Sequence, residues 1–199
     1  MEENVFEQIA NKYDTAERME MAKIITNEVK DALQNSHTKS LIDYGSGTGL
    51  VGLELAPLVK SILLVDSSQK MLDVAQAKIT QKGISNASTF YSDFTQEMPD
   101  DIKADIVVMS LVLLHIPNTR EILQSLFNIL NDEGKLIIVD FDKNDKIQHP
   151  KVHNGFVQED LENLLAEAGF KSTDIHTFHH GEAIFMNQDA SMFIASSLK

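Results

Sequence analysis

Apolar runs and stretches of helical spacing alternate along the chain, and this alternation predicts its secondary structure. Short segments, most of them apolar runs, predict β-strands at residues 40–44, 61–66, 87–91, 106–110 and 135–141. Apolar residues at intervals of three and four predict helices at residues 5–10, 16–34, 49–58, 67–83, 117–134 and 156–168. Two last strands are expected at residues 174–179 and 191–197, with a turn at His179-His180-Gly181 and a mobile polar loop over 142–154.

The order of these elements predicts an α/β fold. Strand and helix alternate as far as the fifth strand, which is typical of a parallel sheet with right-handed helical crossovers. The last two strands have no helix between them, so an antiparallel pair is expected there. Ligands of such sheets bind at the carboxyl ends of the strands.

A glycine-rich loop follows the first predicted strand. The segment LIDYGSGTGL ends the strand in Asp43 and then places glycines at positions 45, 47 and 49. Glycine accepts positive φ in a tight turn, and its missing side chain lets a ligand approach the backbone. The second strand ends in another acid, Asp66, which is a suitable acceptor for ribose hydroxyls. The loop therefore predicts a nucleoside site, whereas Gly52 is expected to serve helix–strand contact.

Two cofactor classes fit this loop. Gly47 to Gly52 matches the dinucleotide pattern G-x-G-x-x-G, and Asp66 follows 19 residues after Gly47, close to the ~20 expected for such folds. Asp43 would repel a pyrophosphate but would tolerate a ligand with an ammonium and a sulfonium. A third strand-end acid, Asp93, and the helical segment before the first strand also argue against a simple dinucleotide domain.

The ordered motifs resemble those of the class I S-adenosylmethionine-dependent methyltransferases. They are DYGSGTG, LLVDSSQKML, YSDF, ADIVVMSLVLLHI and GKLIIVDF, and the similarity covers residues 38–199. The resemblance implies a Rossmann-like three-layer sandwich, whose seven-stranded, mostly parallel sheet has its last strand antiparallel. It further implies one methyltransferase domain over residues 1–199, with a helical lid at 1–37 and an α/β core at 38–199.

The resemblance also implies a set of residues that bind S-adenosylmethionine. Each has a plainer alternative as a strand end, a loop brace, a helix cap or a core residue. Asp43 would lie near the methionine amino end, Asp66 and Ser67 at the ribose, and Asp93 and Phe94 at the adenine. The full predicted set is Tyr13, Asp43, Gly45, Gly47, Asp66, Ser67, Met71, Asp93, Phe94 and Ser110.

The sequence identifies no catalytic residue and no metal site. His115 is a candidate to face the transferred methyl group or to serve a structural role, and the seven histidines form no ligand pattern of known spacing. In-line methyl transfer needs a general base only if the acceptor is protonated. The acceptor should be selected by the N-terminal helices, by residues 111–118 and by the loop at 142–155.

Composition and charge limit the partners. The chain has 199 residues and no cysteine, with an apolar fraction of 43% and no apolar run long enough for a membrane span. Its formal net charge of −13 opposes binding to a phosphate backbone. We therefore expect a cytoplasmic methyltransferase of a small-molecule acceptor, with no nucleic acid or membrane partner and an oligomeric state that the sequence leaves open. A nicotinamide-dependent oxidoreductase and a non-catalytic cofactor-binding protein are the alternatives.

Overall fold

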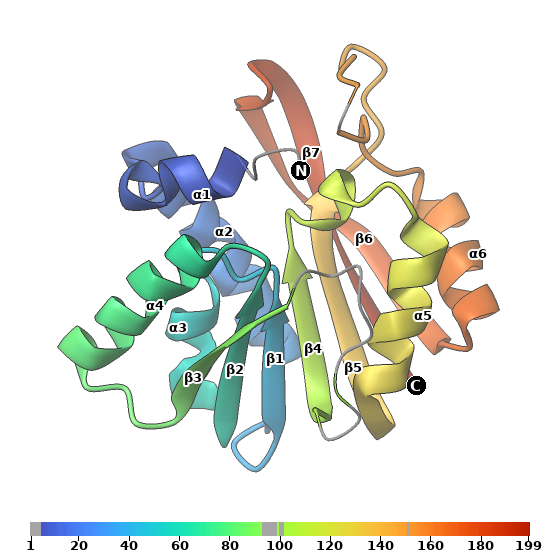
Figure 1. The fold of residues 1–199 in the computed structure, drawn as a ribbon. Helices are drawn as coiled ribbons and strands as arrows, with labels where there is room; N and C mark the ends of the chain where they lie inside the picture. The colour runs from blue at the N-terminus through green and yellow to red at the C-terminus, as the bar shows by residue number, and fades with distance from the viewer. Residues whose placement is uncertain (1–4, 93–98, 100–101, 151) are drawn as a thin grey trace. The chain divides into compact units, whose positions relative to one another are not determined.

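The computed structural model describes residues 5–92, 99, 102–150 and 152–199, with Val5 described by its backbone alone. These residues belong to two compact units, Met1–Pro99 and Asp100–Lys199, whose elements are labelled in Figure 1. The single domain over 1–199, with its lid at 1–37 and core at 38–199, stays a prediction.

The first unit contains three parallel strands. They are β1 (Ser40–Tyr44), β2 (Ser61–Asp66) and β3 (Ala87–Tyr91), in the spatial order β3-β2-β1. All three agree with the strands predicted from the apolar runs. The register pairs Tyr44 with Val65 and Asp66 with Tyr91, so the ends of these strands lie level at one edge of the sheet.

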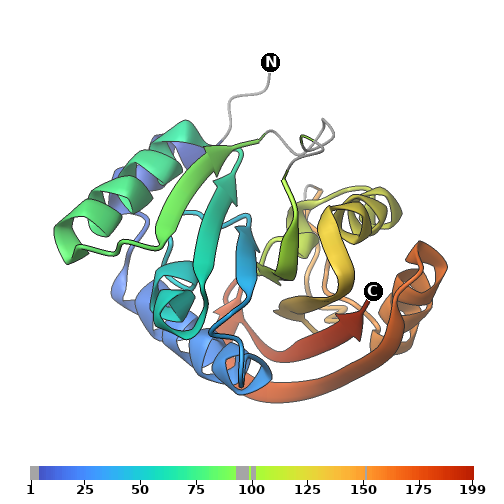
Figure 2. The same cartoon turned by 90° about the horizontal axis from the view of Figure 1, so that it is seen from below.

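The helices of the first unit lie before β1 and between the strands. They are α1 (Val5–Ile9), η1 (Ala10–Lys12), α2 (Ala16–Ala32), α3 (Gly52–Leu55), η2 (Ala56–Leu58) and α4 (Gln69–Lys82). The helix predicted over 49–58 begins later than expected, at Gly52. Gly49 has a φ of 77°, and residues 49–51 form a turn instead of a first helical turn. Helices α2, α3 and α4 lie on one face of the three strands (Figure 2), as crossovers of one hand require.

Local sequence determines where helix α4 begins and ends. The Ser68 hydroxyl accepts a hydrogen bond from the Met71 N–H at 3.2 Å, which satisfies a free donor of the first turn. Gly83 ends the helix with a φ of 65°, in the left-handed conformation that glycine adopts without strain. The predicted buried face is confirmed at Met71, Leu72, Ala75 and Ile79.

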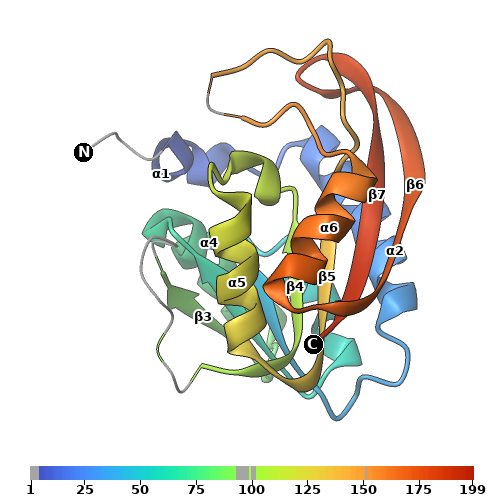
Figure 3. The same cartoon turned by 90° about the vertical axis from the view of Figure 1, so that its right-hand side faces the viewer.

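The second unit contains four strands and two longer helices. The strands are β4 (Ala104–Ser110), β5 (Leu130–Phe141), β6 (Lys171–Phe185) and β7 (Gln188–Leu198), and the helices are η3 (Leu113–His115), α5 (Thr119–Ile129) and α6 (Gln158–Ala168). Helices α5 and α6 lie side by side against the strands (Figure 3). Strands β4 and β5 are parallel, and β7 runs antiparallel to both β5 and β6.

The sheet topology confirms the predicted fold class. The seven strands follow the order β3-β2-β1-β4-β5-β7-β6, with β7 as the antiparallel member. Among the described residues, no helix combines the length and the apolar character needed to cross a bilayer. The cytoplasmic location stays a prediction.

Several boundaries in the second unit differ from the prediction, and all four of its strands are longer than expected. Helix α5 stops at Ile129 instead of continuing to Gly134, because β5 already begins at Leu130. The expected turn at His179-His180-Gly181 is wrong, since these residues pair with β7 inside the long strand β6. The hairpin turns instead at Met186 and Asn187, whose φ angles of 50° and 60° are typical of a two-residue type I′ turn.

Candidate functional site

The glycine loop after β1 depends on backbone conformations that favour glycine. Gly45, Gly47 and Gly49 have φ angles of 78°, 53° and 77°. The N–H groups of Gly45 and Ser46 both donate to the Val65 carbonyl, at 2.8 and 2.9 Å, which fastens the loop to the end of β2. Among the described residues, a Cβ added to Gly47 would have only the Tyr13 side chain within 4 Å, at 3.8 Å. The backbone of Gly47 is therefore open to a neighbouring group.

Asp66 connects the end of β2 to this loop. One carboxylate oxygen accepts a hydrogen bond from the Gly47 N–H at 2.7 Å, and the other accepts one from the Ser68 N–H at 2.8 Å. Burial raises the pKa of Asp66, while the N–H groups of Gly47, Ser68 and Ser67 oppose that shift. A carboxylate has about four acceptor positions. Asp66 therefore orders the loop and keeps acceptor capacity for a ligand hydroxyl.

Asp43 is a buried carboxyl without a partner. Its side chain is 1% exposed, and neither oxygen has a hydrogen-bond partner in the described part of the chain. Burial, and to a lesser degree the charge of Asp66, raise the pKa of Asp43 to about 7; the nearby Gly52 N–H offsets part of this shift without forming a hydrogen bond. A solvated strand end is thus wrong as a description of Asp43, whereas a brace for the loop stays a prediction, because the Gly52 N–H lies nearby. A cationic group would supply the interaction that this carboxyl lacks.

Gly52 allows Asp43 to occupy its position. A Cβ on Gly52 would overlap the Asp43 carboxyl and the Leu64 side chain. The predicted role of Gly52 in close helix–strand contact is therefore confirmed. The loop also contains Ser46, whose buried hydroxyl has no hydrogen-bond partner among the described residues. The sequence did not indicate a role for this second polar group.

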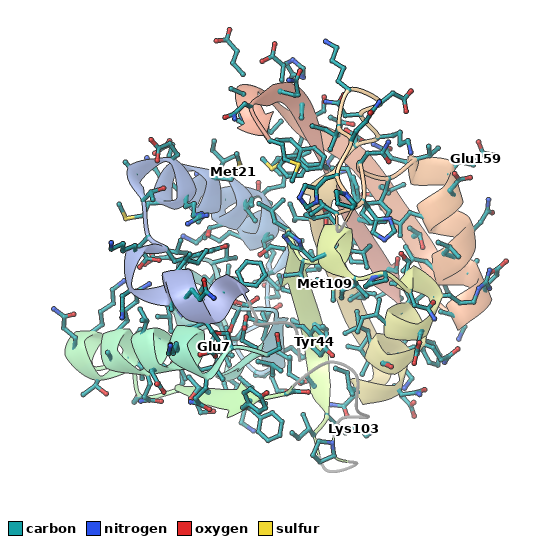
Figure 4. All side chains as sticks on the ribbon, turned by 45° about the horizontal axis from the view of Figure 1, so that its top comes forward. Glu7, Met21, Tyr44, Lys103, Met109 and Glu159 are labelled. Carbon is teal, nitrogen blue, oxygen red and sulfur yellow. The ribbon has the colours of Figure 1, made fainter. Side chains whose placement is uncertain are left out.

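The N-terminal helices bring Tyr13 to the loop. The Arg18 guanidinium lies 4.2 Å from the centre of the Tyr13 ring and donates to the Tyr13 carbonyl at 3.0 Å. Burial raises the pKa of the Tyr13 hydroxyl; Arg18 opposes that shift, whereas Asp66 adds to it. Glu7 lies where α1 passes α4 (Figure 4) and accepts from the Lys70 N–H at 3.2 Å. Helix α1 is thus tied to the start of α4.

A small polar network of Thr48, Asp14 and Lys78 also holds the loop, and the sequence did not reveal it. The Thr48 hydroxyl donates to Asp14 at 2.5 Å, and Lys78 donates to the Thr48 carbonyl at 2.8 Å. Lys78 also forms an ion pair with Asp14 at 2.6 Å. No spacing in the sequence indicates this network, because its members come from three separate segments.

The remaining predicted residues of the first unit are less informative. Ser67 directly follows Asp66 and is half-buried, whereas Ser68 caps α4, as expected. Met71 is 1% exposed and belongs to the buried face of α4. Asp93 and Phe94 lie outside the described residues, so their predicted contacts with adenine stay predictions.

In the second unit, Ser110 ends β4 next to a strained residue. Leu111 has a φ of 53° and donates its N–H to the Val139 carbonyl at 2.8 Å. A non-glycine residue with positive φ is uncommon, and such strain is concentrated at functional sites. This feature supports a role for the end of β4, but it was not visible in the sequence.

Asp140 organises the chain that follows β4. It is completely buried in β5 and accepts hydrogen bonds from the N–H groups of Leu114 at 3.1 Å and Phe141 at 2.8 Å. Burial raises the pKa of Asp140 to about 7, and the surrounding N–H groups limit the shift. Asp140 therefore holds η3, the short helix that contains His115. The sequence marked Asp140 only as part of a strand.

Two segments expected to select the acceptor are bonded to each other. The His153 N–H donates to the Leu114 carbonyl at 2.8 Å, and the His153 ring lies 2.8 Å from the Ile116 carbonyl. The segment predicted to be a mobile loop is thus tied to residues 111–118. Burial, and to a lesser degree His149, lower the pKa of His115, so its imidazole is neutral near pH 7. No group of three potential metal ligands occurs within the described ranges.

The geometry of the first unit fits a cationic nucleoside. It combines an unpartnered carboxyl, an open glycine backbone and a strand-end acid with free acceptor capacity. Residues 35–181 match the family described as "Methyltransferase domain". The chain belongs to this methyltransferase family. It is a class I S-adenosylmethionine-dependent methyltransferase, as the motifs predicted, and this result favours the methyl donor over a nicotinamide cofactor.

Relatives of the chain act on different acceptors. An uncharacterized methyltransferase of Schizosaccharomyces pombe is 23% identical, covering 83% of this chain and 77% of the relative. The tRNA 5-carboxymethoxyuridine methyltransferase of Escherichia coli is 24% identical, covering 78% and 63%. The ubiquinone/menaquinone biosynthesis C-methyltransferase UbiE of Vibrio parahaemolyticus is 22% identical, covering 89% and 83%.

Solved structures share the fold. The crystal structure of a SAM-dependent methyltransferase from Aquifex aeolicus superimposes with a TM-score of 0.72 at 16% identity. The similarity covers 96% of this chain and 97% of that protein. At this identity the comparison establishes the architecture.

Proposed function

We propose that this enzyme transfers the methyl group of S-adenosylmethionine to a small-molecule acceptor by in-line displacement. The observation that carries the proposal is the Asp43 carboxyl, which is buried and has no hydrogen-bond partner in the described part of the chain. Such a carboxyl is stabilised by a cation, and the methionine end of this donor carries an ammonium next to a sulfonium.

The other donor contacts follow from the same loop. Asp66 has acceptor capacity for the ribose hydroxyls, Gly47 leaves room for the ligand beside its backbone, and Tyr13 borders Gly47. Gly45, with its φ of 78°, is proposed as a further contact of the same loop. Further contacts are proposed for Ser67, Met71, Asp93, Phe94 and Ser110. When bound, the donor supplies a methyl group on a sulfur that is already a good leaving group.

The enzyme's own task is to place the acceptor. Its nucleophilic atom must come within ~3–3.5 Å of the methyl carbon and in line with the leaving sulfur. We assign the acceptor to the segment after β4, where Asp140 holds η3 and His153 fastens the following loop. If the acceptor carries a proton, His115 of η3 is the proposed candidate to accept it.

Charge favours a small molecule over a nucleic acid. One relative is a tRNA methyltransferase, while another acts in quinone biosynthesis, so the family alone leaves both classes open. This chain has 30 acidic and 17 basic residues, which opposes long-range attraction to RNA. We therefore place the acceptor among small molecules.

Thermal unfolding with added ligands tests the donor. S-adenosylmethionine and S-adenosylhomocysteine at about 100 times their Kd should each add ~2.7 kcal/mol to the free energy of unfolding. NAD⁺ and NADH at the same concentrations are the matched controls and should leave the melting temperature unchanged. Stabilisation by the nicotinamides alone would overturn the proposal.

Transfer of labelled methyl groups tests the acceptor class. The enzyme is incubated with methyl-labelled S-adenosylmethionine and either total tRNA or a panel of phenols, quinols, amines and thiols. We expect label in a small-molecule product that grows with enzyme concentration. Label that enters only the tRNA would contradict the small-molecule assignment and leave the donor assignment intact.

A further inference from the structure

The first unit contains a groove that lies outside the proposed donor contacts. Its volume is about 410 Å³, within the range of small-molecule pockets, and residues of α2, α3, α4 and the outer part of the glycine loop line it. These helices share one face of the strands (Figure 2). Asp43, Asp66, Tyr13 and Gly47, proposed to bind the donor, do not line it.

The groove is cationic on an acidic protein. Its lining includes Lys23, Lys30, Lys78 and Lys82 against two acids, Asp14 and Glu54, a local excess of two positive charges. The whole chain has a formal net charge of −13. Clustering of four of the 17 basic residues around one groove is typical of a site for an anion.

The four lysines differ in their partners. Lys78 and Lys82 pair with the lining acids Asp14 and Glu54, at 2.6 and 3.1 Å. Lys23 pairs with Glu20 at 3.8 Å, a distance typical of weak surface pairs. Lys30 forms no ion pair with any residue that the structure describes. Lys30 is therefore the cation most available to a ligand.

The rest of the lining is largely apolar. Leu50 and Leu53 contribute side chains from the glycine loop and α3, and Ala22 and Met19 contribute theirs from α2. Met19 is 49% exposed, which is high for a large apolar side chain. A ligand with a short apolar body would remove this surface from water.

A hydroxyl without a partner also borders the groove. Thr26 of α2 lines it and is 2% exposed, yet its hydroxyl has no hydrogen-bond partner among the described residues. A buried unpartnered hydroxyl is unfavourable. Threonine in a helix has two accessible χ1 rotamers, so this hydroxyl can turn to donate to an acceptor in the groove.

From these observations we propose that the groove binds a small amphipathic anion, with a carboxylate or phosphate head near Lys30 and Thr26 and a short apolar body against Met19 and Leu53. The site lies outside the donor contacts, so both ligands can be bound together. Binding here does not depend on which acceptor the enzyme methylates.

Titrations with probes of matched shape test this proposal. The methionine methyl groups are labelled with carbon-13, and the Met19 signal is assigned from a Met19→Leu variant. Hexanoate and hexyl phosphate are added in the presence of saturating S-adenosylhomocysteine, with hexanol and hexylammonium as neutral and cationic controls. We expect saturable shifts of the Met19 signal with the two anions and at least ~5-fold weaker binding of both controls.

Single substitutions identify the head-group contacts. Lys30→Gln should weaken hexanoate binding by about fivefold, whereas Lys60→Gln, an exposed lysine outside the groove, should leave it unchanged. Thr26→Val keeps the shape of the side chain and should weaken binding about threefold, a loss within the range for one hydrogen bond. The proposal is overturned if hexanoate leaves Met19 unshifted, if hexanol binds equally well, or if Lys30→Gln and Lys60→Gln bind hexanoate alike. Failure of S-adenosylhomocysteine to bind would count against the donor site alone.

Discussion

Asp43 and Asp140 are both buried carboxyls near the carboxyl ends of β-strands, but their hydrogen bonding differs. Asp43, in the first unit, is 1% exposed and has no partner among the described residues. Asp140, in the second unit, is fully buried and accepts from two backbone N–H groups. Burial raises both pKa values to about 7. Equal burial with different partners indicates that Asp140 orders the protein, whereas for Asp43 we propose a role in ligand binding.

Removing each carboxyl should therefore affect a different property. Loss of Asp140 leaves backbone donors without an acceptor, which lowers stability. Asp43 forms no hydrogen bond with a described residue, so the main effect of its loss should appear in ligand binding.

The largest effect is expected for Asp140→Ala. The N–H groups of Leu114 and Phe141 lose their acceptor, and each buried unpartnered donor costs ~1–3 kcal/mol, so the free energy of unfolding should fall by ~2–6 kcal/mol. Urea denaturation measures this change. At pH 4, near the ordinary aspartate pKa of 3.8, titration of Asp43 contributes little to stability, so Asp43→Asn is the control there and should alter stability by less than ~1 kcal/mol. Equal losses in the two variants would remove the distinction between the two carboxyls.

Asp66→Ala should weaken donor binding by a few kcal/mol at most. The loop loses its bond to the Gly47 N–H, and the donor loses a charge-assisted bond worth ~1.5–3 kcal/mol. Calorimetric titration with S-adenosylhomocysteine measures the loss, and Asp73→Ala, in the helix that follows, is a control outside the proposed donor contacts. An unchanged Kd in Asp66→Ala would mean that the ribose contact lies elsewhere.

Gly52→Ala tests the space around Asp43. The added methyl group would overlap the Asp43 carboxyl and Leu64, and overpacking of this kind costs ~1–3 kcal/mol of stability. Donor affinity should fall as well, because the Asp43 carboxyl must move. Gly83→Ala is the control, since its Cβ would meet nothing within 4 Å and only its φ of 65° opposes the change. Retention of full stability and donor affinity in Gly52→Ala would show that Asp43 has room to move.

The smallest effect, taken for one group and one pH unit, is the dependence of stability on pH. Between the usual aspartate pKa of 3.8 and about 7, the folded protein holds protons on Asp43 and Asp140 that the unfolded chain has released. The free energy of unfolding should therefore fall as pH rises through this window, by at most ~1.4 kcal/mol per pH unit for each group, and level off above it. Asp43→Asn should remove the contribution of Asp43 to this pH dependence. An identical slope in wild type and Asp43→Asn, measured by urea denaturation at several pH values, would contradict the raised pKa of Asp43.

Two strands of the first unit, β1 and β2, could be predicted closely because buried parallel strands are largely apolar. β3 contains polar residues and has no buried residue, but its predicted ends also agree. Residues 40–44, 61–66 and 87–91 are bounded by polar residues or glycine, and their predicted ends agree with β1, β2 and β3. The hairpin of β6 and β7 is longer than predicted, because polar residues and bulges interrupt the pattern of β6. Its turn at Met186 and Asn187 contains no glycine, so the usual sequence signal of such a turn is missing.

Some residues of the candidate site could likewise be predicted from sequence, and others could not. The glycines and Asp66 could be proposed from sequence because their effect depends on local backbone and on the ends of adjacent strands. Asp140 could not, since its partner Leu114 lies 26 residues away and contributes only a backbone N–H. The bond between Thr48 and Asp14, 34 residues apart, was hidden for the same reason.

Calorimetric titration of S-adenosylmethionine into wild type and Asp43→Asn at pH 8 is the most direct test of the role of Asp43. Asp43 is ionised at this pH, so wild type should bind, while Asp43→Asn should remain folded and bind ~10–100-fold more weakly, the loss expected for one charge-assisted interaction. A Kd that is unchanged in a well-folded Asp43→Asn variant, or no binding by wild type, would contradict the claim that this buried carboxyl receives the cationic end of the methyl donor.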